Sequence, residues 1–404
     1  MSDPDHILYT SHPDLGLVLN SGTDLIAAAL GPSISLASSA RPVQIRFIPG
    51  RSVVAQFTAM VAIDGGEPRT ETFVITVGRR IPQGIAVVTA GEAQVGVWQV
   101  PDDPYLPGLK TASSEKSAGQ LLEQLGVESE GATSRRRAYR PGRRAVVEIR
   151  TRRERVFAKI VRPERIAQLQ NRHDLLVGQA PIPTSLGWSE AQGIVMLQAL
   201  DGISLLSGIE GGGDALPSAA SLLDLLDSLE GIEVPGTTRP RLVDRVTSHA
   251  EFISTVHPKL EHRASALAHT IEELARPEPH RTMHGDFHSS QIMIQHGEIT
   301  GLVDIDTVGS GERTDDLANI LAHLAAVASA RPNSAQAAAR YGAELTSGFG
   351  SVVDPRQLRV RVAAALLGFA LGPFRVQEAN WRNATEKRLE LAEQWLASAA
   401  TTSL

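Results

Sequence analysis

The chain has 404 residues, of which 42% are hydrophobic and 21% are charged, an ordinary globular composition long enough for two or three domains. It contains no cysteine, which excludes a disulfide framework, a thiolate zinc site and a cysteine nucleophile, and suits the reducing cytoplasm. A formal net charge of −6 argues against a general affinity for nucleic acid.

The first half of the chain contains an internal repeat. IRFIPGRSVVAQF, residues 45–57, matches RAYRPGRRAVVEI, residues 137–149, because in both segments alternating apolar residues flank a Pro-Gly-Arg sequence. This pattern predicts two strands about a tight turn. A third strand is expected after each copy, over residues 71–77 (ETFVITV) and 155–161 (RVFAKIV).

The repeat predicts two related β-rich modules, residues 1–110 and 111–200. The prolines and serines of VPDDPYLPGLKTASSEKS are typical of a linker between them. Residues 135–165 are dense in arginine. This run is either a solvated β-surface or a cationic wall that attracts a polyphosphate, and the sequence leaves both interpretations open.

Lys159 distinguishes the second copy from the first. When Phe157 and Phe73 are matched, Ile75 occupies the corresponding position in the first copy. A lysine in such an apolar strand would be costly in a core without an anionic partner. The alternative is a lysine on an edge strand that reaches solvent.

Beyond about Leu205 the hydrophobic periodicity becomes helical, which predicts a helical module over residues 201–404. Its expected helices are SLLDLLDSLEGI, VTSHAEFISTV, ASALAHTIEELA, DDLANILAHLAAVASA and RLELAEQWLASA. Between Arg281 and Asp306 the pattern instead predicts turns and short strands. The apolar segment from Val362 to Phe374 is too short for a bilayer and predicts a buried helix. MSDPDHILYTSH does not resemble a signal peptide, so no association with a membrane is expected.

Two acidic motifs lie in this non-helical stretch, HGDFHSSQ (284–291) and LVDID (302–306). Gln291 follows Asp286 by five residues, which reproduces the H-x-D-x-x-x-x-N spacing with glutamine in place of asparagine. One turn could aim the Asp286 carboxylate at an acceptor hydroxyl and the Gln291 amide oxygen at a metal ion. Asp304 would then bind magnesium, which prefers hard oxygen ligands, with Asp306 as a further candidate. These are the groups that phosphoryl transfer requires.

A β-rich module with a strand lysine, followed by a helical module with a carboxylate-bearing loop, is the arrangement of a kinase. We therefore predict an α+β protein with a bilobal protein-kinase-like fold. It would consist of an extra β-rich N-terminal cap module, a β-rich N-lobe and a mainly helical C-lobe.

Over about residues 135–330 the sequence resembles the aminoglycoside phosphotransferase and choline kinase family. The resemblance is carried by HGDFHSSQ, VDID and Asp316-Leu317-Ala318. The glutamine at position 291, together with the extra N-terminal module, is most similar to the actinobacterial maltokinase and glucosamine kinase branch.

The resemblance implies a kinase that transfers the γ-phosphate of ATP, with Mg²⁺, to a hydroxyl of a small molecule. It implies Asp286 as the catalytic base, Gln291 and Asp304 on Mg²⁺, and Lys159 on the nucleotide phosphates. The backbone from Gln198 to Leu200 would meet adenine as a hinge, the alternative being an ordinary buried strand. The oligomeric state is not indicated.

The resemblance leaves two features of the expected N-lobe open. Arg140-Pro141-Gly142-Arg143 occupies the place of the loop over the phosphates, and is either a nucleotide contact or a plain hairpin turn. The acidic partner of the strand lysine should fall near Gln168, which is not acidic. Glu164 and Asp174 are the alternatives.

Structural roles are expected for other polar residues near the expected catalytic loop. His284 and His288 are expected to hold the loop by hydrogen bonds, and zinc is not expected without cysteine or a spaced histidine pair. Asp316 would cap the following helix or brace the loop. The first β-rich module, which lacks the strand lysine, should bind no nucleotide and act as a cap with Trp98 as its packing anchor.

The acceptor is expected to be selected in the helical lobe, where FRVQEANWRN (374–383) contains Glu378 and Trp381. A tryptophan face with a carboxylate suits a sugar or amino sugar, while an amphipathic helix with a solvated face is the alternative. An aminoglycoside antibiotic phosphotransferase remains a second possible function. A kinase-fold binding protein that has lost transfer is a third, suggested by Gln291 and the missing helix acid.

Overall fold

The computed structural model of the protein describes residues 4–213, 215–236 and 238–401. The chain forms two compact units. Unit 1 comprises residues 1–168, 185–198 and 374–379, and unit 2 comprises residues 169–184, 199–373 and 380–404. The chain therefore returns to the larger, helical unit directly after Gln198, where the sequence predicts a hinge.

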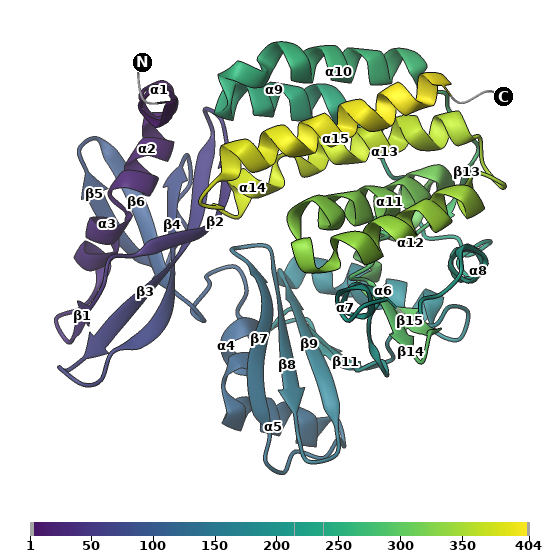
Figure 1. The fold of residues 1–404 in the computed structure, drawn as a ribbon. Helices are drawn as coiled ribbons and strands as arrows, with labels where there is room; N and C mark the ends of the chain where they lie inside the picture. The colour runs from purple at the N-terminus through teal and green to yellow at the C-terminus, as the bar shows by residue number, and fades with distance from the viewer. Residues whose placement is uncertain (1–3, 214, 237, 402–404) are drawn as a thin grey trace. The chain divides into compact units, whose positions relative to one another are not determined.

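Unit 1 opens with three short helices and a six-stranded antiparallel sheet (Figure 1). The elements are α1 (Pro4–Ser11), α2 (Pro13–Asn20), α3 (Gly22–Ala29), β1 (Ile34–Leu36), β2 (Arg41–Ile48), β3 (Ser52–Ile63), β4 (Arg69–Gly78), β5 (Ala86–Ala90) and β6 (Ala93–Gln99). The strand order is β1-β3-β4-β6-β5, with β2 also paired to β3. Helices α2 and α3 pack on this sheet. They were not predicted, because eight residues give little more than two turns of helical periodicity.

A second antiparallel sheet follows two further helices in unit 1. The elements are α4 (Gly108–Ser113), α5 (Glu115–Gln124), β7 (Thr133–Arg140), β8 (Arg144–Arg150), β9 (Arg155–Val161), β10 (Ser185–Ser189) and β11 (Ile194–Gln198), with the sheet order β10-β11-β9-β8-β7. The linker predicted at residues 100–117 is wrong in part, because it contains α4 and the start of α5. Its Ser114 is an N-cap whose hydroxyl accepts the Ser117 N–H at 3.3 Å.

Both predicted hairpins form, and their ladders fix how the two copies of the repeat correspond. Val54 lies opposite Thr76 in the first copy, and Val146, at the same distance from its turn, lies opposite Lys159. The counterpart of Lys159 is therefore Thr76 and not Ile75. The match of Phe157 with Phe73 had shifted the two third strands by one residue. Because side chains alternate between the two faces of a sheet, such a shift compares side chains that point to opposite faces. Threonine is neutral, so the first copy still has no cation at this position.

A chain of buried polar groups connects the two sheets of unit 1. The Trp98 Nε1–H donates to the Tyr139 hydroxyl at 3.1 Å, and that hydroxyl donates to the Asp103 carboxylate at 2.7 Å. The same Asp103 oxygen accepts the Gly142 N–H at 2.8 Å. Val54 and Trp98 of the first sheet also share one hydrophobic cluster with residues of the second. Trp98 thus occupies the anchoring position that the sequence predicts.

Unit 2 is mainly helical, and the five predicted helical segments are helices. Its helices are α7 (Leu205–Glu210), α8 (Ala219–Asp227), α9 (Val246–Val256), α10 (Glu261–Leu274), α11 (Arg313–Ala330), α12 (Ala335–Phe349), α13 (Pro355–Phe369) and α15 (Trp381–Thr401). Helices α6 (Pro163–Leu176) and α14 (Gly372–Arg375) cross between the units. The buried helix predicted from Val362 to Phe374 is confirmed as far as Phe369, where α13 ends, whereas its last residues are wrong because a turn leads into α14 at Gly372. No helix in the described parts of the chain has the length and apolarity needed to cross a bilayer.

Short strands interrupt these helices around the acidic motifs. They are β12 (Ile203–Ser204), β13 (His280–Met283), β14 (Ile292–Gln295), β15 (Glu298–Leu302) and β16 (Gly309–Glu312). One three-stranded sheet has the order β12-β14-β15, and β13 pairs with β16. The His-Gly-Asp motif, residues 284–291, is the connection from β13 to β14.

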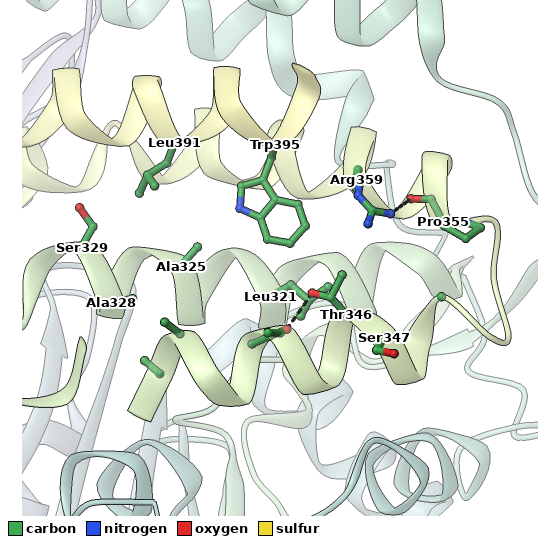
Figure 2. Close-up of a pocket in the computed structure, with 15 residues that line it drawn as sticks. Leu321, Ala325, Ala328, Ser329, Thr346, Ser347, Pro355, Arg359, Leu391 and Trp395 are labelled. Atoms are coloured by element: carbon green, nitrogen blue, oxygen red, sulfur yellow. Dashed lines mark hydrogen bonds between the residues drawn. The ribbon is translucent and has the colours of Figure 1, made fainter. Parts of the chain in front are cut away.

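A groove of about 950 Å³ lies among helices α11, α12, α13 and α15 of unit 2 (Figure 2). Its lining is mostly alanine, glycine and other small residues, with Leu321, Leu391 and Trp395 as the larger apolar side chains. None of the predicted catalytic or binding residues lines this groove. Its size therefore gives no information about the acceptor.

We predict that Trp98 stabilises unit 1 by joining its two sheets. Trp98→Ala should reduce the free energy of unfolding by about 3–5 kcal/mol, the usual range for a buried tryptophan. Trp98→Phe should lose about 1 kcal/mol, since it keeps most of the packing but removes the hydrogen bond to Tyr139. Urea unfolding measures both. Trp188, whose surface is 44% exposed, is the control, and its alanine variant should change stability by less than about 0.5 kcal/mol.

Equal losses for the Trp98→Ala and Trp188→Ala variants would contradict an anchoring role. The comparison is informative because both changes remove the same side chain from the same unit, so they differ chiefly in burial.

Candidate active site

The His-Gly-Asp motif forms a tight loop after β13. Gly285 has a φ of +80°, and a Cβ built there would lie 2.6 Å from the Thr307 carbonyl oxygen. Both the left-handed backbone and the close approach require glycine at this position. The next residue, Asp286, presents a side chain that is 42% exposed. The loop therefore holds its backbone tightly while leaving one carboxylate accessible.

Asp316, in the first turn of α11, braces this loop from the core side. One carboxylate oxygen accepts the His284 N–H at 2.6 Å and the other accepts the Gly285 N–H at 2.8 Å. The predicted bracing role is confirmed, whereas the alternative role as a cap is wrong because Glu312 is the N-cap residue of α11. Burial raises the pKa of Asp316 to about 7, although the two N–H groups favour its charged form.

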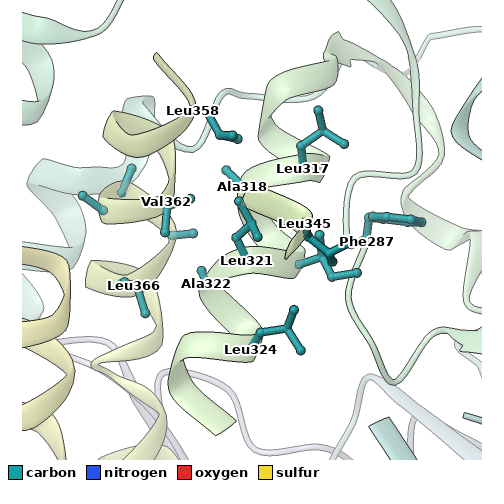
Figure 3. Close-up of a cluster of buried hydrophobic side chains, with 14 of the residues drawn as sticks. Phe287, Leu317, Ala318, Leu321, Ala322, Leu324, Leu345, Leu358, Val362 and Leu366 are labelled. Carbon is teal, nitrogen blue, oxygen red and sulfur yellow. The ribbon is translucent and has the colours of Figure 1, made fainter. Parts of the chain in front are cut away.

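Helix α11 is itself fixed within the core of unit 2. Figure 3 shows its Leu317 and Leu321 between Phe287 of the His-Gly-Asp loop and Leu358 and Val362 of α13. All of these side chains are fully or almost fully buried. A carboxylate carried by this helix is consequently held as rigidly as the core itself.

A second carboxylate, Asp315, also anchors the start of α11. The guanidinium of Arg361, which is fully buried, pairs with Glu312 and lies 3.1 Å from the Asp315 carboxylate. Asp315 also accepts the Leu242 N–H at 2.9 Å. Burial raises the pKa of Asp315 to about 6. The sequence showed the Asp315-Asp316 pair but gave no local signal for Arg361, which comes from another helix.

The two histidines of the motif hold the loop in place, as expected. His284 is fully buried, and its Nε2 lies 3.1 Å from the Val303 carbonyl oxygen. The His288 ring stacks on His323, with ring centroids 4.7 Å apart. The Ser289 hydroxyl lies 2.9 Å from Nδ1 of His323, and burial lowers the pKa of His323 to about 3. His323 is therefore a neutral partner that fixes the end of the loop.

Gln291 and Asp304, the predicted metal ligands, lie side by side. The Gln291 Nε2 donates to an Asp304 carboxylate oxygen at 3.3 Å. The backbone carbonyl oxygen of Gln291 also accepts the Val303 N–H at 2.8 Å. This bond fixes the backbone of Gln291 next to the segment that carries Asp304. Asp304 lies beyond β15, which ends at Leu302, and has a left-handed backbone with φ 62° and ψ 48°. Non-glycine residues in this conformation are concentrated at functional sites.

This donor set fits magnesium bound together with phosphate. An amide oxygen and a carboxylate are hard ligands, and Mg²⁺ typically takes one or two carboxylates from the protein and completes its shell with phosphate and water. Among the described residues, no group of three or more histidine, cysteine or acidic side chains could hold a metal ion. A site at Gln291 and Asp304 would therefore take its remaining ligands from a nucleotide rather than from a protein cage.

Asp306, the further metal candidate, lies near the buried Arg172 and the half-buried Arg239 of unit 2. The Arg239 guanidinium donates to the Asp306 carbonyl oxygen at 3.0 Å. Burial lowers the pKa of both Arg172 and Arg239, and the negative charge of Asp306 opposes this effect. Sequence reasoning missed both arginines, because each is separated from Asp306 by at least sixty residues and belongs to no motif. Asp306 thus serves as their counter-charge.

Lys159 lies on an inner strand of unit 1, since β9 is flanked by β8 and β11. It is 5% exposed, so the alternative of a solvent-reaching lysine on an edge strand is wrong. Its predicted acidic partner stays a prediction. Glu164 is exposed in unit 1, whereas Asp174 lies in unit 2 and accepts the Gln170 amide at 2.8 Å.

The remaining predicted binding residues are divided between the units. Gln198 ends β11 opposite Val156 in unit 1, while Leu200 belongs to unit 2. Glu378 is exposed in unit 1. Trp381 begins α15 in unit 2, and the Arg382 guanidinium lies 4.2 Å from its ring centroid. One face of the Trp381 ring is therefore covered, so any sugar would have to use the other.

The braced His-Gly-Asp loop, the adjacent Gln291–Asp304 pair and a sheet with a buried strand lysine define a kinase-like phosphotransferase. The chain belongs to the phosphotransferase enzyme family, whose family model matches residues 122–359. Membership confirms the predicted enzyme class, a phosphotransferase with a hydroxyl acceptor, and the expected cofactors ATP and Mg²⁺. No curated protein matches the chain.

Solved structures with a similar fold include two of a thermostable variant of aminoglycoside phosphotransferase APH(4)-Ia. The ternary complex with ADP and hygromycin B has 14% identity and a TM-score of 0.51, covering 70% of this chain and 98% of that chain. The apo form has 14% identity and a TM-score of 0.50, covering 70% of this chain and 99% of that chain. The likeness confirms the predicted α+β kinase-like fold.

We predict that Asp316→Asn lowers kcat and stability, because one carboxylate oxygen becomes an NH₂ donor that opposes a backbone N–H of the loop. Steady-state kinetics and urea unfolding measure the two effects. Glu233→Gln, at an exposed carboxylate of the same unit, is the control and should change neither.

The pH dependence of stability provides a sharper test of this residue. The pKa of Asp316 is raised to about 7 in the folded protein, so its contribution to stability is greatest below the unfolded pKa and declines as pH rises toward 7. Between about pH 5 and about pH 8 the wild type should lose more stability than Asp316→Asn. Parallel pH profiles would show that this carboxylate does not titrate as expected.

Proposed function

We propose that this protein is an ATP-dependent kinase that phosphorylates a hydroxyl of a sugar or amino sugar, as in the maltokinase and glucosamine kinase branch. One observation carries the proposal above all. The buried Asp316 carboxylate holds the backbone of His284 and Gly285, and so presents the half-exposed Asp286 from a rigid loop.

Asp286 is our candidate for the catalytic base. It would accept the acceptor's hydroxyl proton as that oxygen forms a bond to the γ-phosphorus, while the bond to the bridging oxygen breaks and ADP leaves. Its partial exposure suits this role, because a fully buried carboxylate could not reach a substrate. The His288 Nε2, 3.8 Å from an Asp286 oxygen, would help to orient the carboxylate.

Four groups are our candidates for holding the nucleotide. Mg²⁺ bound by Gln291 and Asp304 would neutralise charge on the phosphate oxygens. Lys159 would pair with the phosphates, and the backbone from Gln198 to Leu200 would meet adenine at the point where the chain changes unit. A protein that had lost transfer would have no need for this set of groups, which argues against a pure binding protein.

Charge favours a sugar over a polycationic aminoglycoside as the acceptor. In the segment 374–383, the side chains of Arg375 and Arg382 add positive charge next to Glu378 and Trp381, our candidates for acceptor binding. The charges of Arg140 and Arg143 are also close enough to Arg375 to lower its pKa, after the larger effect of burial. Such surroundings would repel a polycation. The fold shared with APH(4)-Ia does not select the acceptor, because one fold hosts many substrates.

We predict ADP release with ATP, Mg²⁺ and a neutral or singly charged sugar, when a panel of sugars, amino sugars and aminoglycosides is tested. Asp286→Asn should lower kcat on the active acceptor by about 10²- to 10⁴-fold, the usual contribution of a general base. Glu298→Gln, at an exposed carboxylate of β15, is the control and should retain full turnover.

Near-normal turnover by Asp286→Asn would remove this residue from the mechanism. Activity confined to aminoglycosides would replace the sugar with the antibiotic as the acceptor.

We also predict that Asp304→Ala is more damaging than Gln291→Ala, because Asp304 supplies a formal charge to the metal and Gln291 only an amide oxygen. Gln291→Asn should be tolerated in part, since a displacement of about 1 Å already disturbs positioning. The measurement is the Mg²⁺ concentration needed for half-maximal activity and for nucleotide binding. Equal shifts for Asp304→Ala and Gln291→Ala would contradict the assignment.

A further inference from the structure

Arg239 of unit 2 contacts the turn that follows Asp304 at two points. Its guanidinium Nη2–H donates to the Asp306 carbonyl oxygen at 3.0 Å. Its backbone N–H donates to the Ser310 carbonyl oxygen at 2.7 Å. Asp306 lies in the short 3₁₀ helix Ile305–Thr307, and Ser310 lies in β16. One arginine from a distant segment therefore spans the connection between a predicted metal ligand and the next strand.

The same turn also contacts the His-Gly-Asp loop. A Cβ built on Gly285 would lie 2.6 Å from the Thr307 carbonyl oxygen, so the two backbones approach without room for a side chain. The Val303 carbonyl oxygen lies 3.1 Å from Nε2 of His284. The residues before and after Asp304 are thus held against the loop that carries the candidate catalytic base.

Asp304 itself has a left-handed backbone, with φ 62° and ψ 48°, which few residues other than glycine adopt. This conformation is unfavourable and persists only where the surrounding contacts enforce it. The side chains of Ile305 and Val308 are buried and supply apolar contacts, whereas Arg239 supplies a directional hydrogen bond to the backbone. Without that bond, the turn could relax toward a commoner conformation and displace the Asp304 carboxylate.

The charge of Arg239 does not explain its position. Burial lowers the pKa of Arg239, and the charges of Arg172 and Arg245 lower it further, although the charge of Asp306 opposes them. A cation close to a magnesium site also repels the dication. What favours an arginine here is consequently its hydrogen bond to the turn rather than its charge.

We propose that Arg239 is a positioning residue of this enzyme, which holds the turn after Asp304 so that the Asp304 carboxylate faces Mg²⁺. The inference rests on the proposed function for the role of Asp304 as a metal ligand. An arginine suits this task, because its long side chain ends in a rigid group of donors. Groups that orient a metal ligand without touching the metal contribute strongly to metal affinity.

Arg172 separates the effect of the bond from the effect of the charge. It is 7% exposed, and burial lowers its pKa while the charge of Asp306 opposes this effect. Among the described residues, its side chain donates no hydrogen bond to the turn, and its Nε has no hydrogen-bond partner. Arg172 is therefore a neighbouring cation that shares the charge environment of Arg239 but lacks its bond.

The test measures how tightly the full-length protein binds a non-hydrolysable ATP analogue, with saturating Mg²⁺ and with EDTA, by isothermal titration calorimetry. Arg239→Met should bind the Mg²⁺ complex about 10- to 100-fold more weakly than the wild type, the usual cost of losing a group that orients a metal ligand. It should bind the metal-free analogue as the wild type does. Arg239→Lys should restore part of the loss, because an ammonium can still donate to the Asp306 carbonyl oxygen.

Two further arginines provide controls. Arg172→Met should bind the Mg²⁺ complex as tightly as the wild type does, because it removes a neighbouring charge but no bond to the turn. Arg359 is the matched residue, since it is half-buried in unit 2 and its guanidinium donates to a backbone carbonyl oxygen, that of Pro355, at 3.0 Å. Arg359→Met should change neither affinity.

A double variant shows whether Arg239 acts through Asp304. Asp304→Ala should itself weaken binding of the Mg²⁺ complex. Adding Arg239→Met should weaken it no further, because the effects of two residues that act through one contact do not add. If Arg239→Met does not fold, Arg239→Lys replaces it, and its smaller loss should again be confined to the Mg²⁺ complex.

Full affinity of Arg239→Met for the Mg²⁺ complex, an equal loss in Arg172→Met, or additive losses in the double variant would overturn the proposal. Weaker binding of the metal-free analogue would also overturn it, since Arg239 would then serve as a cation for the phosphates. If Asp304→Ala binds the Mg²⁺ complex normally, the metal role within the proposed function fails, and the positioning role with it. If Asp304→Ala loses affinity and Arg239→Met does not, only the positioning role is wrong.

Discussion

A buried carboxylate sets the position of the His-Gly-Asp loop. Asp316 is 1% exposed and accepts two consecutive backbone N–H groups, those of His284 and Gly285. Two donors that converge on one carboxylate fix both the location and the direction of the loop, which a single hydrogen bond could not do. Asp286 is the next residue, so the backbone position from which its side chain projects is restricted. Preorganisation of this kind is what electrostatic and general-base catalysis require.

The rigidity of Asp316 comes from the helix that carries it. Helix α11 is packed on α12 and α13, and its first turn is additionally tied to Arg361 through Asp315 and Glu312. A buried guanidinium is tolerable only with such partners, because an unpaired charge in the core would be strongly destabilising. The ion pairs at the start of α11 thus help to hold the carboxylate that braces the loop. Core and catalytic loop form one continuous set of contacts.

The two copies of the repeat in unit 1 have different roles. The second hairpin leads into the strand that carries Lys159, whereas the first places neutral Thr76 at the equivalent position. The first sheet nevertheless contributes to the turn of the second. Trp98 is linked through Tyr139 to Asp103, whose carboxylate also holds Gly142 in the turn. A module without its own strand lysine therefore supports a loop of its neighbour.

The sequence by itself determined those helices, strands and motifs whose residue pattern lies within a short segment of the chain. Hairpins about Pro-Gly-Arg, amphipathic helices with apolar residues three and four apart, and the spacing of Asp286, Gln291 and Asp304 are all readable within short windows. The same spacing identified the chemistry, because phosphoryl transfer needs a carboxylate and hard metal ligands in that order. The short N-terminal helices and the helices in the supposed linker were missed, since each contains too few turns to show a period.

Tertiary structure alone decided the partners and the register. The match of Lys159 with Thr76 depends on how the second and third strands of each copy pair. A connecting loop of different length can shift this pairing without any change in the sequence pattern of the strands. Arg361 and Arg239 reach Asp315 and Asp306 from segments far away in the chain. The burial that raises the pKa of Asp316 is likewise a property of the packed core. Local sequence specifies which groups are available, but only packing brings distant groups together and removes the water between them.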